Sequence, residues 1–405
     1  MRPGARVDLV LAALFVGIVG IYDIAYVVFS LARGPRIGPY IHVLFPDFLV
    51  FYAAAQAFLE GKLSIIYDLA AITQYQNDLY FPERFPALVT FRPFFYPPIW
   101  LLMVLPFALL AVTKAYVAFM SFTVGAATAV EGRRAPWGWL AVLTCPAAAW
   151  VVVAGQNTFL SVALFYGGFR LLDRAPAWAG VLLGCLSYKP QIWVLVPLAL
   201  LAARKWRALA WMAGTVTALS LASLLVFGLD TWLAFFAAIH EMESAKIADE
   251  IFNRVFMHMT TLLASARLLG LSRVAASVLQ AAGALLAIAA AWRAFRRYGS
   301  SDAQIAVLAV ATFLVSPYTL NYDLLLLMPA AVALFRQAIH QGFLPFERLV
   351  YLFLWLIPTA MWVLNQLQVP IAPLIILAFG LIAWQRLTPV PTESWTPSVR
   401  HREMG

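Results

Sequence analysis

The feature that most constrains this chain is a succession of apolar runs, each about 15–24 residues long, which would be long enough to cross a bilayer as helices. Hydrophobic residues make up 63% of the 405 residues and charged residues only 12%. That charged share is about half of what a soluble domain carries. The alternating pattern of membrane β-barrel strands is not visible. The sequence therefore predicts an all-α, polytopic membrane protein with about 12–14 spans.

The apolar runs form one continuous unit with no large soluble appendage. We expect a single transmembrane domain over residues 1–387, with long external loop segments at 33–95 and 228–270. Residues 388–405 form a polar tail that is expected to be cytoplasmic and disordered. Cys145 and Cys185 lie inside apolar runs and predict no disulfide framework. The net charge of +9 fits basic cytoplasmic loops and requires no nucleic-acid partner.

Arginine and lysine residues predict which loops face the cytoplasm. Arg2 and Arg6 place the N-terminus there, and the basic groups at 204–207 and 293–297 agree with that start. The same assignment gathers several polar segments on the non-cytoplasmic face with Asp47, namely 155–157, 188–191, 228–270 and 316–323. Arg133-Arg134 conflict with it, because two passes between 97 and 131 would place them outside. The number of crossings in that region therefore stays open.

The segment from Phe45 to Gly61 is predicted to be a short amphipathic helix at the membrane surface. Pro46 and Asp47 stand where the helix would begin, and Gly61 follows its last turn. Apolar residues between them recur at helical spacing, at 48, 51, 55, 58 and 59. Asp47 is either a helix N-cap or a functional carboxylate. The two interpretations are compatible, because a capped carboxylate is also an oriented one.

Charged and amide side chains beside apolar runs are informative, because such groups are costly to place in a membrane. Lys189 could reach to the interface or could face an anionic head group. Gln156 and Asn157 could cap helix ends or could donate hydrogen bonds to sugar hydroxyls. For Asp323, which precedes a run of leucines, an N-cap is the favoured interpretation.

Cations on the same face could bind a phosphate. Arg254 and His258 are one helical turn apart, and with Arg92 and Lys189 they could form a cationic cluster. Arg254 could instead pair with a nearby carboxylate, and a lone histidine is more often structural. The sequence has no His, Cys or carboxylate group with metal-ligand spacing. Such a set suits sugar and phosphate chemistry next to lipid, and it could equally line a transporter cavity.

The order of these motifs resembles the integral-membrane glycosyltransferases of the GT-C type. The resemblance begins with Pro46-Asp47-Phe48-x-x-Phe51-Tyr52 in the first external loop and covers about residues 9–385. It narrows to glycosyltransferase family 87, the polyprenyl-phosphate-mannose-dependent α-mannosyltransferases, with four further motifs: Phe95-Tyr96-Pro97-Pro98, Gly155-Gln156-Asn157, Lys189-Pro190-Gln191 and Ser316-Pro317-Tyr318 through Tyr322-Asp323.

The resemblance implies a hexosyltransferase, with mannose as the expected sugar, in the inner (plasma) membrane of a bacterium. A sugar would pass with inversion from a polyprenyl-phosphate-linked donor to a lipid or glycan acceptor, on the non-cytoplasmic face and among membrane lipids. Asp47 would be the general base. Lys189, Arg254 and Arg92 would bind the donor phosphate, without a metal or another cofactor. The sugar or acceptor would be bound by His258, Gln156, Asn157, Tyr67, Tyr96, Gln191, Tyr318, Tyr322 and Asp323.

The alternative function is a transporter or flippase of lipid-linked sugars. A transporter favours an internal repeat and charges at the bilayer midplane. The sequence shows neither a repeat nor clear pairs of broken helices. A ligase of lipid-linked polymers should carry its dominant external loop late in the chain, whereas the early loop is the longest here.

Overall fold

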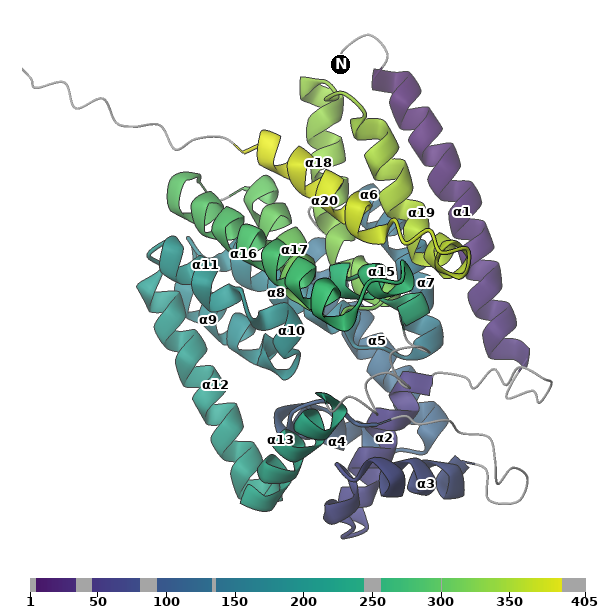
Figure 1. Cartoon of the computed structure of the whole chain (residues 1–405), viewed down its shortest axis with the longest axis vertical. Helices are drawn as coiled ribbons and strands as arrows, with labels where there is room; N and C mark the ends of the chain where they lie inside the picture. The colour runs from purple at the N-terminus through teal and green to yellow at the C-terminus, as the bar shows by residue number, and fades with distance from the viewer. Residues whose placement is uncertain are drawn as a thin grey trace, which may run out of the picture.

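A computed structural model describes residues 5–33, 46–80, 93–132, 136–243, 256–299 and 301–387. Most of these residues are helical, and no β-strand occurs among them; an isolated antiparallel bridge joins Met259 and Leu320. Figure 1 shows the helices packed into one body. The predicted all-α, polytopic fold class is confirmed.

The first half of the chain contains mostly short helices and two long ones, Ala5–Arg33 and Val112–Glu131. Its elements are α1 (Ala5–Arg33), α2 (Pro46–Leu59), η1 (Leu63–Ile65), α3 (Leu69–Tyr80), α4 (Pro98–Ala108), α5 (Val112–Glu131), α6 (Pro136–Leu143), α7 (Pro146–Ala154), α8 (Thr158–Leu171), α9 (Pro176–Cys185), η2 (Leu186–Tyr188), α10 (Pro190–Trp193) and α11 (Val196–Ala202).

The second half contains most of the long helices. Its elements are α12 (Trp206–Phe227), α13 (Leu229–Glu243), η3 (Phe256–His258), α15 (Leu262–Leu268), α16 (Arg273–Arg297), α17 (Asp302–Val315), η4 (Asn321–Leu327), α18 (Met328–Gln341), α19 (Glu347–Gln366) and α20 (Ala372–Gln385).

Helix length gives fewer spans than the sequence predicted. Among the described residues, five helices are long and apolar enough to cross a membrane, or up to seven if each of two bent pairs counts as one span. Most of the other predicted spans are apolar helices of only 10–17 residues. A helix of 14 residues rises about 21 Å, which is less than the roughly 30 Å of a hydrocarbon core. Helix length therefore does not support the predicted 12–14 spans.

The region between residues 97 and 131 forms a sharply bent pair of helices, which by length and composition counts as at most one span. The 11-residue helix α4 is too short to span, and α4 and α5 meet at an angle of 117°. Glu131, at the end of α5, forms an ion pair with Arg170, at the end of α8. The end of α5 therefore lies beside Arg170, which the positive-inside rule assigns to the cytoplasmic side. An odd number of crossings removes the conflict with Arg133-Arg134, although those two residues lie outside the described part of the chain.

The centre of the body is formed by helices that are buried on all sides. In α8 the twelve residues from Thr158 to Phe169 are buried, and in α17 the eleven from Ala303 to Phe313 are buried. Apolar side chains around the whole circumference are what such central helices require. By contrast, α1 and α12 have only 11% of their apolar windows buried. They therefore lie at the edge of the body.

The segment that contains Asp47 lies at one end of this body. Figure 1 shows α2, α3, α4 and α13 gathered there, with α12 running down one side. Helix α2 begins and ends as predicted: Gly61 has φ +74°, and Lys62 N donates to Ala57 O, as in a Schellman C-cap. The prediction that α2 is an amphipathic helix lying on the membrane surface is wrong, because nine of its 14 residues are buried and they are not confined to one face. The small alanines of α2 allow neighbouring helices to cover it.

Candidate functional site

The site is built around a sharp turn between α7 and α8. Gly155 ends α7 with φ +72°, a left-handed conformation that costs glycine little, and Gln156 N donates to Val151 O at 2.9 Å. The turn leaves Gln156 and Asn157 between the two helices, with exposed fractions of only 3% and 0%. Two adjacent amides are therefore fixed inside the body, where their hydrogen-bonding groups need partners.

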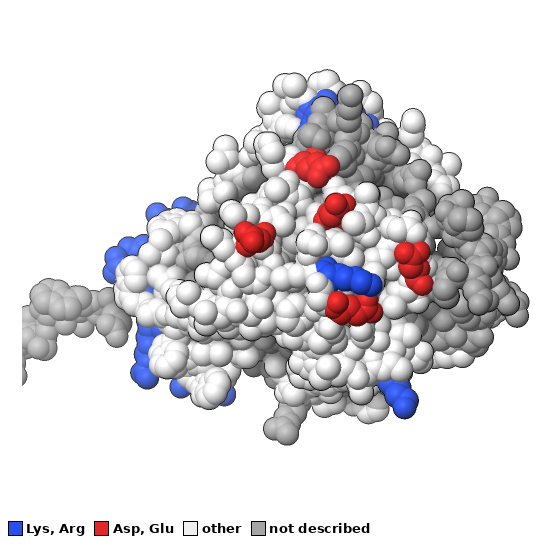
Figure 2. Space-filling model, turned by 90° about the horizontal axis from the view of Figure 1, so that it is seen from below, with Lys and Arg blue, Asp and Glu red and all other residues white. Residues whose placement is uncertain are grey.

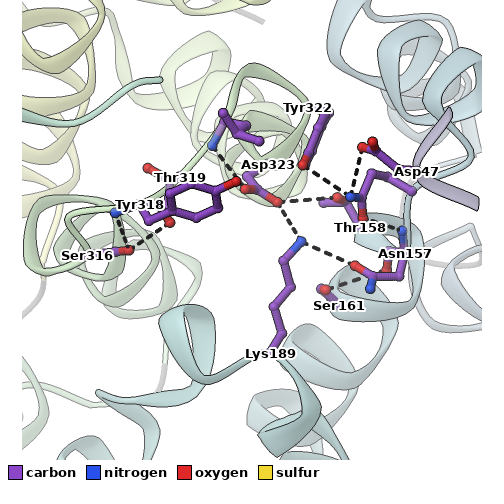
Figure 3. A network of polar contacts seen from close by, with 12 residues as sticks. Asp47, Asn157, Thr158, Ser161, Lys189, Ser316, Tyr318, Thr319, Tyr322 and Asp323 are labelled. Atoms are coloured by element: carbon purple, nitrogen blue, oxygen red, sulfur yellow. Dashed lines mark hydrogen bonds and ion pairs between the residues drawn. The ribbon is translucent and has the colours of Figure 1, made fainter. Parts of the chain in front are cut away.

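Asp47 lies within hydrogen-bonding distance of the first of these amides. Gln156 Nε2 donates to Asp47 Oδ2 at 3.0 Å, although the two residues are 109 positions apart in the sequence. Figure 3 shows the contact beside Tyr322. Asp47 occupies the first turn of α2, where the helix dipole favours a negative charge, and its side chain is half-buried. Its carboxylate is thus both oriented and partly accessible.

Two tyrosines complete the surroundings of the Gln156 amide. Its second N–H donates to the hydroxyl of Tyr322 at 3.1 Å, and its Oε1 accepts a hydrogen bond from the hydroxyl of Tyr96 at 3.3 Å. The backbone N–H of Asn157 also donates to Oε1, at 3.0 Å. Asp47, Tyr96, Gln156 and Tyr322 therefore form one connected set from four parts of the chain.

Lys189 and Asp323 form a buried ion pair next to this set. Lys189 Nζ lies 2.6 Å from Asp323 Oδ1, and the side chains are 1% and 3% exposed. The same ammonium donates to Asn157 Oδ1 at 3.2 Å and lies 5.8 Å from the centre of the Tyr322 ring. Of the two alternatives for Lys189, the one in which the side chain reaches to the interface is wrong, because the ammonium points into the body (Figure 3).

Asp323 also makes the backbone contact expected of a cap. Its Oδ2 accepts from Leu320 N at 3.1 Å at the start of η4, and its Oδ1 accepts from Thr158 Oγ1 at 3.4 Å. The capping interpretation and the pairing with Lys189 therefore hold together. A buried carboxylate with one ammonium and two further donors is well satisfied, which such a group requires.

Tyr67 and Tyr318 lie beside the network in different ways. The Tyr67 hydroxyl donates to Tyr96 O at 2.8 Å, so Tyr67 holds the backbone that presents Tyr96. Tyr318 follows Ser316, whose Oγ accepts from Tyr318 N at 3.1 Å. Burial, and then the negative charges of Asp47 and Asp323, raise the pKa of Tyr318 above its ordinary value. The Tyr318 hydroxyl therefore stays protonated near both carboxylates.

Among the described residues, no hydrogen bond joins His258 or Gln191 to the network. The His258 ring packs 6.2 Å from that of Trp150, and burial lowers the pKa of His258. Gln191, in the short helix α10, makes no hydrogen bond to these groups in the described part of the chain. Arg92 and Arg254 lie outside the described residues.

Sequence reasoning missed three residues that support the network. Thr158 contacts Asp323, and the Tyr188 hydroxyl lies 2.9 Å from Ser161 Oγ and 3.4 Å from Asn157 O. The Tyr188 ring also stacks on Trp100, with centroids 4.5 Å apart. Thr158 and Tyr188 directly follow or precede residues that the motifs singled out, so adjacency was the available signal.

A separate cavity lies at the far end of α8. It has a volume of about 400 Å³ and is lined by Glu131, Trp139, Arg170, Asp302 and Arg336, among others. From Thr158 at the network to Arg170 at the cavity, α8 rises roughly 18 Å. No predicted site residue lines this cavity. The polar network around Gln156 thus lies at the opposite end of α8 from this cavity.

The charges of the network limit its chemistry. Its described ionisable groups are two carboxylates, Asp47 and Asp323, and one ammonium, Lys189, which already pairs with Asp323. No three His, Cys, Asp or Glu side chains gather as a metal site in the part of the chain that the structure describes. A half-buried carboxylate held by an amide can accept a proton from a hydroxyl group.

Comparison with known proteins agrees with this chemistry. The model of glycosyltransferase family 87 matches residues 94–317, more than half of the 405-residue chain. The match includes Gln156, Asn157 and Lys189 and begins after Asp47. Comparisons with curated proteins and with solved structures gave no match. The chain therefore belongs to glycosyltransferase family 87, and its activity is that of a membrane glycosyltransferase.

Proposed function

We propose that the chain transfers a sugar from a polyprenyl-phosphate-linked donor to a lipid or glycan acceptor, with inversion and with Asp47 as general base. The observation that carries the proposal is the 3.0 Å contact from Gln156 Nε2 to Asp47 Oδ2, because it fixes a half-buried carboxylate in a buried polar network. Membership of a glycosyltransferase family supports the reaction class, and the transporter alternative finds no support.

In the proposed reaction, Asp47 takes the proton from the acceptor hydroxyl as the oxygen of that hydroxyl attacks the sugar. The acceptor oxygen forms a bond to the anomeric carbon, on the face opposite the leaving phosphate. The bond from that carbon to the phosphate oxygen breaks, and the phosphate leaves with the electron pair. Proton removal need only be partial in the transition state, so a carboxylate of ordinary basicity is sufficient.

The leaving phosphate gains negative charge and needs stabilisation. We retain Lys189 as a phosphate ligand in the proposal, together with Arg92 and Arg254 on sequence grounds alone. The Lys189 ammonium shares its charge with Asp323 at 2.6 Å, so its attraction for a phosphate is reduced. The described charges of the network sum to one negative charge when Asp47 is ionised. We therefore expect further cations to take part in donor binding.

The sugar is proposed to be mannose, on the basis of the family resemblance. The network and its immediate surroundings offer hydroxyl and amide groups of the kind that bind sugar hydroxyls, on Asn157, Tyr96, Tyr318 and Tyr322. Tyr67, which holds the backbone of Tyr96, stays a proposed ligand, and so do His258 and Gln191 on the basis of the resemblance.

The active site is proposed to face the non-cytoplasmic side. Figure 2 views the body from the end of α2 and α13. Acidic side chains are spread over the central part of the described surface there, together with one basic patch, and further basic side chains lie around the edge of the view. Arg170, Lys205 and Arg348 belong to helix ends that the positive-inside rule places in the cytoplasm. A lipid-linked donor at that surface would keep its chain in the bilayer and its phosphate near the network.

Transfer from labelled polyprenyl-phosphate mannose into lipids of membranes containing the protein tests the proposal. Label in a new glycolipid, absent from membranes without the protein, is the expected result. Transfer from a polyprenyl-phosphate pentose alone would keep the reaction class and replace mannose. Transfer from a nucleotide sugar alone, or none from any lipid-linked sugar, would overturn the proposed donor.

A further inference from the structure

We propose that Gln156 is a positioning residue for Asp47 and does not bind the sugar or the acceptor. This inference rests on the proposed role of Asp47 as general base. It departs from the expectation that the Gln156 amide would donate hydrogen bonds to sugar hydroxyls.

The hydrogen-bonding capacity of the Gln156 amide is already used within the protein. A glutamine side chain has two N–H donors and two acceptor lone pairs. The donors reach Asp47 Oδ2 at 3.0 Å and the Tyr322 hydroxyl at 3.1 Å. The lone pairs accept from the Tyr96 hydroxyl at 3.3 Å and from Asn157 N at 3.0 Å. With Gln156 only 3% exposed, a sugar hydroxyl would have to displace one of these partners.

The hydrogen-bond partners also fix the orientation of the Gln156 amide. Asn157 N can only donate, and an ionised Asp47 carboxylate can only accept. Turning the amide over would place Nε2 against the Asn157 N–H and Oε1 against the carboxylate, which are two repulsive contacts. One N–H of Gln156 therefore always points at Asp47.

The residues on both sides of Gln156 are themselves held in place. Gly155 sets the turn before it, and Asn157 is tied by its Oδ1 to Lys189 at 3.2 Å. Lys189 is in turn paired with Asp323 at 2.6 Å. A side chain on such a support loses little entropy when it holds another group in place. Rigid support of this kind is what a positioning residue requires.

The consequence for Asp47 is both geometric and electrostatic. A hydrogen bond donated to the ionised carboxylate favours that form over the protonated acid, so it keeps the base ready at neutral pH. It also holds the carboxylate toward the acceptor. Loss of the contact should therefore lower the rate of the chemical step more than it weakens the binding of either substrate.

The test compares Gln156→Met, Gln156→Glu and Gln280→Met by their pH–rate profiles and their KM values for donor and acceptor. Gln280 is the matched control, because it is 6% exposed and its amide is also satisfied, by Leu263 N at 3.1 Å and Leu314 O at 2.8 Å, but it lies outside the network. All three proteins are first compared by thermal unfolding in detergent.

Gln156→Met is expected to lower kcat by about 10²-fold, with each KM changed by less than about threefold. The acidic limb of kcat/KM should move up by about one pH unit, because the ionised form of Asp47 loses a donor. Gln156→Glu should move the limb further, because a second carboxylate beside Asp47 opposes its ionisation. Gln280→Met should leave the limb in place.

A large rise in the donor or acceptor KM, with kcat and the acidic limb unchanged, would overturn the inference and return Gln156 to the sugar pocket. If Gln156→Met does not fold, the profile of Gln156→Glu decides alone, since an unmoved limb there also contradicts it. An active Asp47→Asn protein would instead remove the base itself. The two failures are therefore distinguishable.

Discussion

Lys189 Nζ lies 2.6 Å from Asp323 Oδ1, and this buried ion pair joins the start of α10 to η4 across 134 residues of sequence. A buried pair recovers the cost of desolvating two charges only when further hydrogen bonds satisfy them. Here Asn157 Oδ1 accepts from the ammonium, and Leu320 N donates to the carboxylate. The pair thereby connects the turn that contains Gln156 with the segment that contains Tyr322.

Removing one member of this pair should be more harmful than removing both charges. Lys189→Met or Asp323→Asn alone leaves a buried group without its partner, which typically costs about 3–5 kcal/mol for an unpaired charge. The double variant leaves no unpaired charge, so its loss of stability should be well below the sum of the two single losses. Unfolding of the four proteins in detergent measures this coupling.

Donor kinetics of the same variants separate structure from phosphate binding. If Lys189 also binds the donor phosphate, the double variant should recover stability while its donor KM stays raised. Wild-type donor KM in a stable double variant would remove Lys189 from the phosphate site. Strictly additive stability losses would contradict the importance of the ion pair.

A second buried ion pair, far from Asp47, should matter for stability alone. Arg386 Nε donates to Glu347 Oε1 at 2.6 Å, and Arg386 Nη2 donates to Glu347 Oε2 at 2.5 Å. Glu347 is 0% exposed. Arg386→Met should destabilise the protein by about 3–5 kcal/mol, because it leaves a buried carboxylate without its cation. The neighbouring Arg348, which is 60% exposed and pairs with Asp8, is the matched control.

Arg348→Met should cost about 0–1 kcal/mol, as surface pairs do. Thermal unfolding of the two variants makes the comparison, with transfer assayed well below the unfolding temperature. Equal losses, or a donor KM altered by Arg386→Met, would contradict the assignment of this pair to the scaffold.

His258 should make the folded protein less stable in acid. Burial lowers the pKa of His258 from the ordinary value of 6.5, so below about pH 6.5 the unfolded chain binds a proton that the folded chain resists. The contribution of His258 to the free energy of unfolding is therefore retained above pH 6.5 and falls as the pH drops through that value. His258→Phe, which keeps a ring against Trp150, should flatten this dependence.

Unfolding of the wild type and of His258→Phe at pH 5.5 and 7.5 measures the effect. The difference between the two pH values should be smaller in the variant. An identical pH dependence in both proteins would mean that His258 is not the group responsible.

Local signals in the sequence predicted part of this structure well. The limits of α2 follow from Pro46 and Asp47 at its start and Gly61 after its end, because caps depend on a few neighbouring residues. The charge pattern also gathered Asp47, Gln156, Lys189 and Asp323 on one face, and the structure brings them into one network. The positions of lysine and arginine could predict this grouping because loops rich in these residues tend to stay on the cytoplasmic side of a membrane.

Local sequence signals did not predict which side chains contact one another or where helices bend. The pairing of Lys189 with Asp323 depends on how short helices pack, so the sequence suggested only that each residue was polar and on the same side. Apolar composition alone does not show where a helix bends, and the 55° break between α6 and α7 lies inside one predicted span. The sequence suggested that Gln156 binds sugar, because it does not reveal that the hydrogen-bonding groups of the Gln156 amide already have partners within the protein.

The most direct test of the account is the rate of sugar transfer by Asp47→Asn, with Asp68→Asn as control. Asp68 caps α3 through Ala70 N and Ala71 N at 3.0 and 2.8 Å, and asparagine is an equally good cap. Asp47→Asn should lose about 10³-fold or more in kcat while it still binds the donor, and Asp68→Asn should match the wild type. Wild-type turnover in purified, folded Asp47→Asn protein would contradict the central claim that Asp47 is the general base.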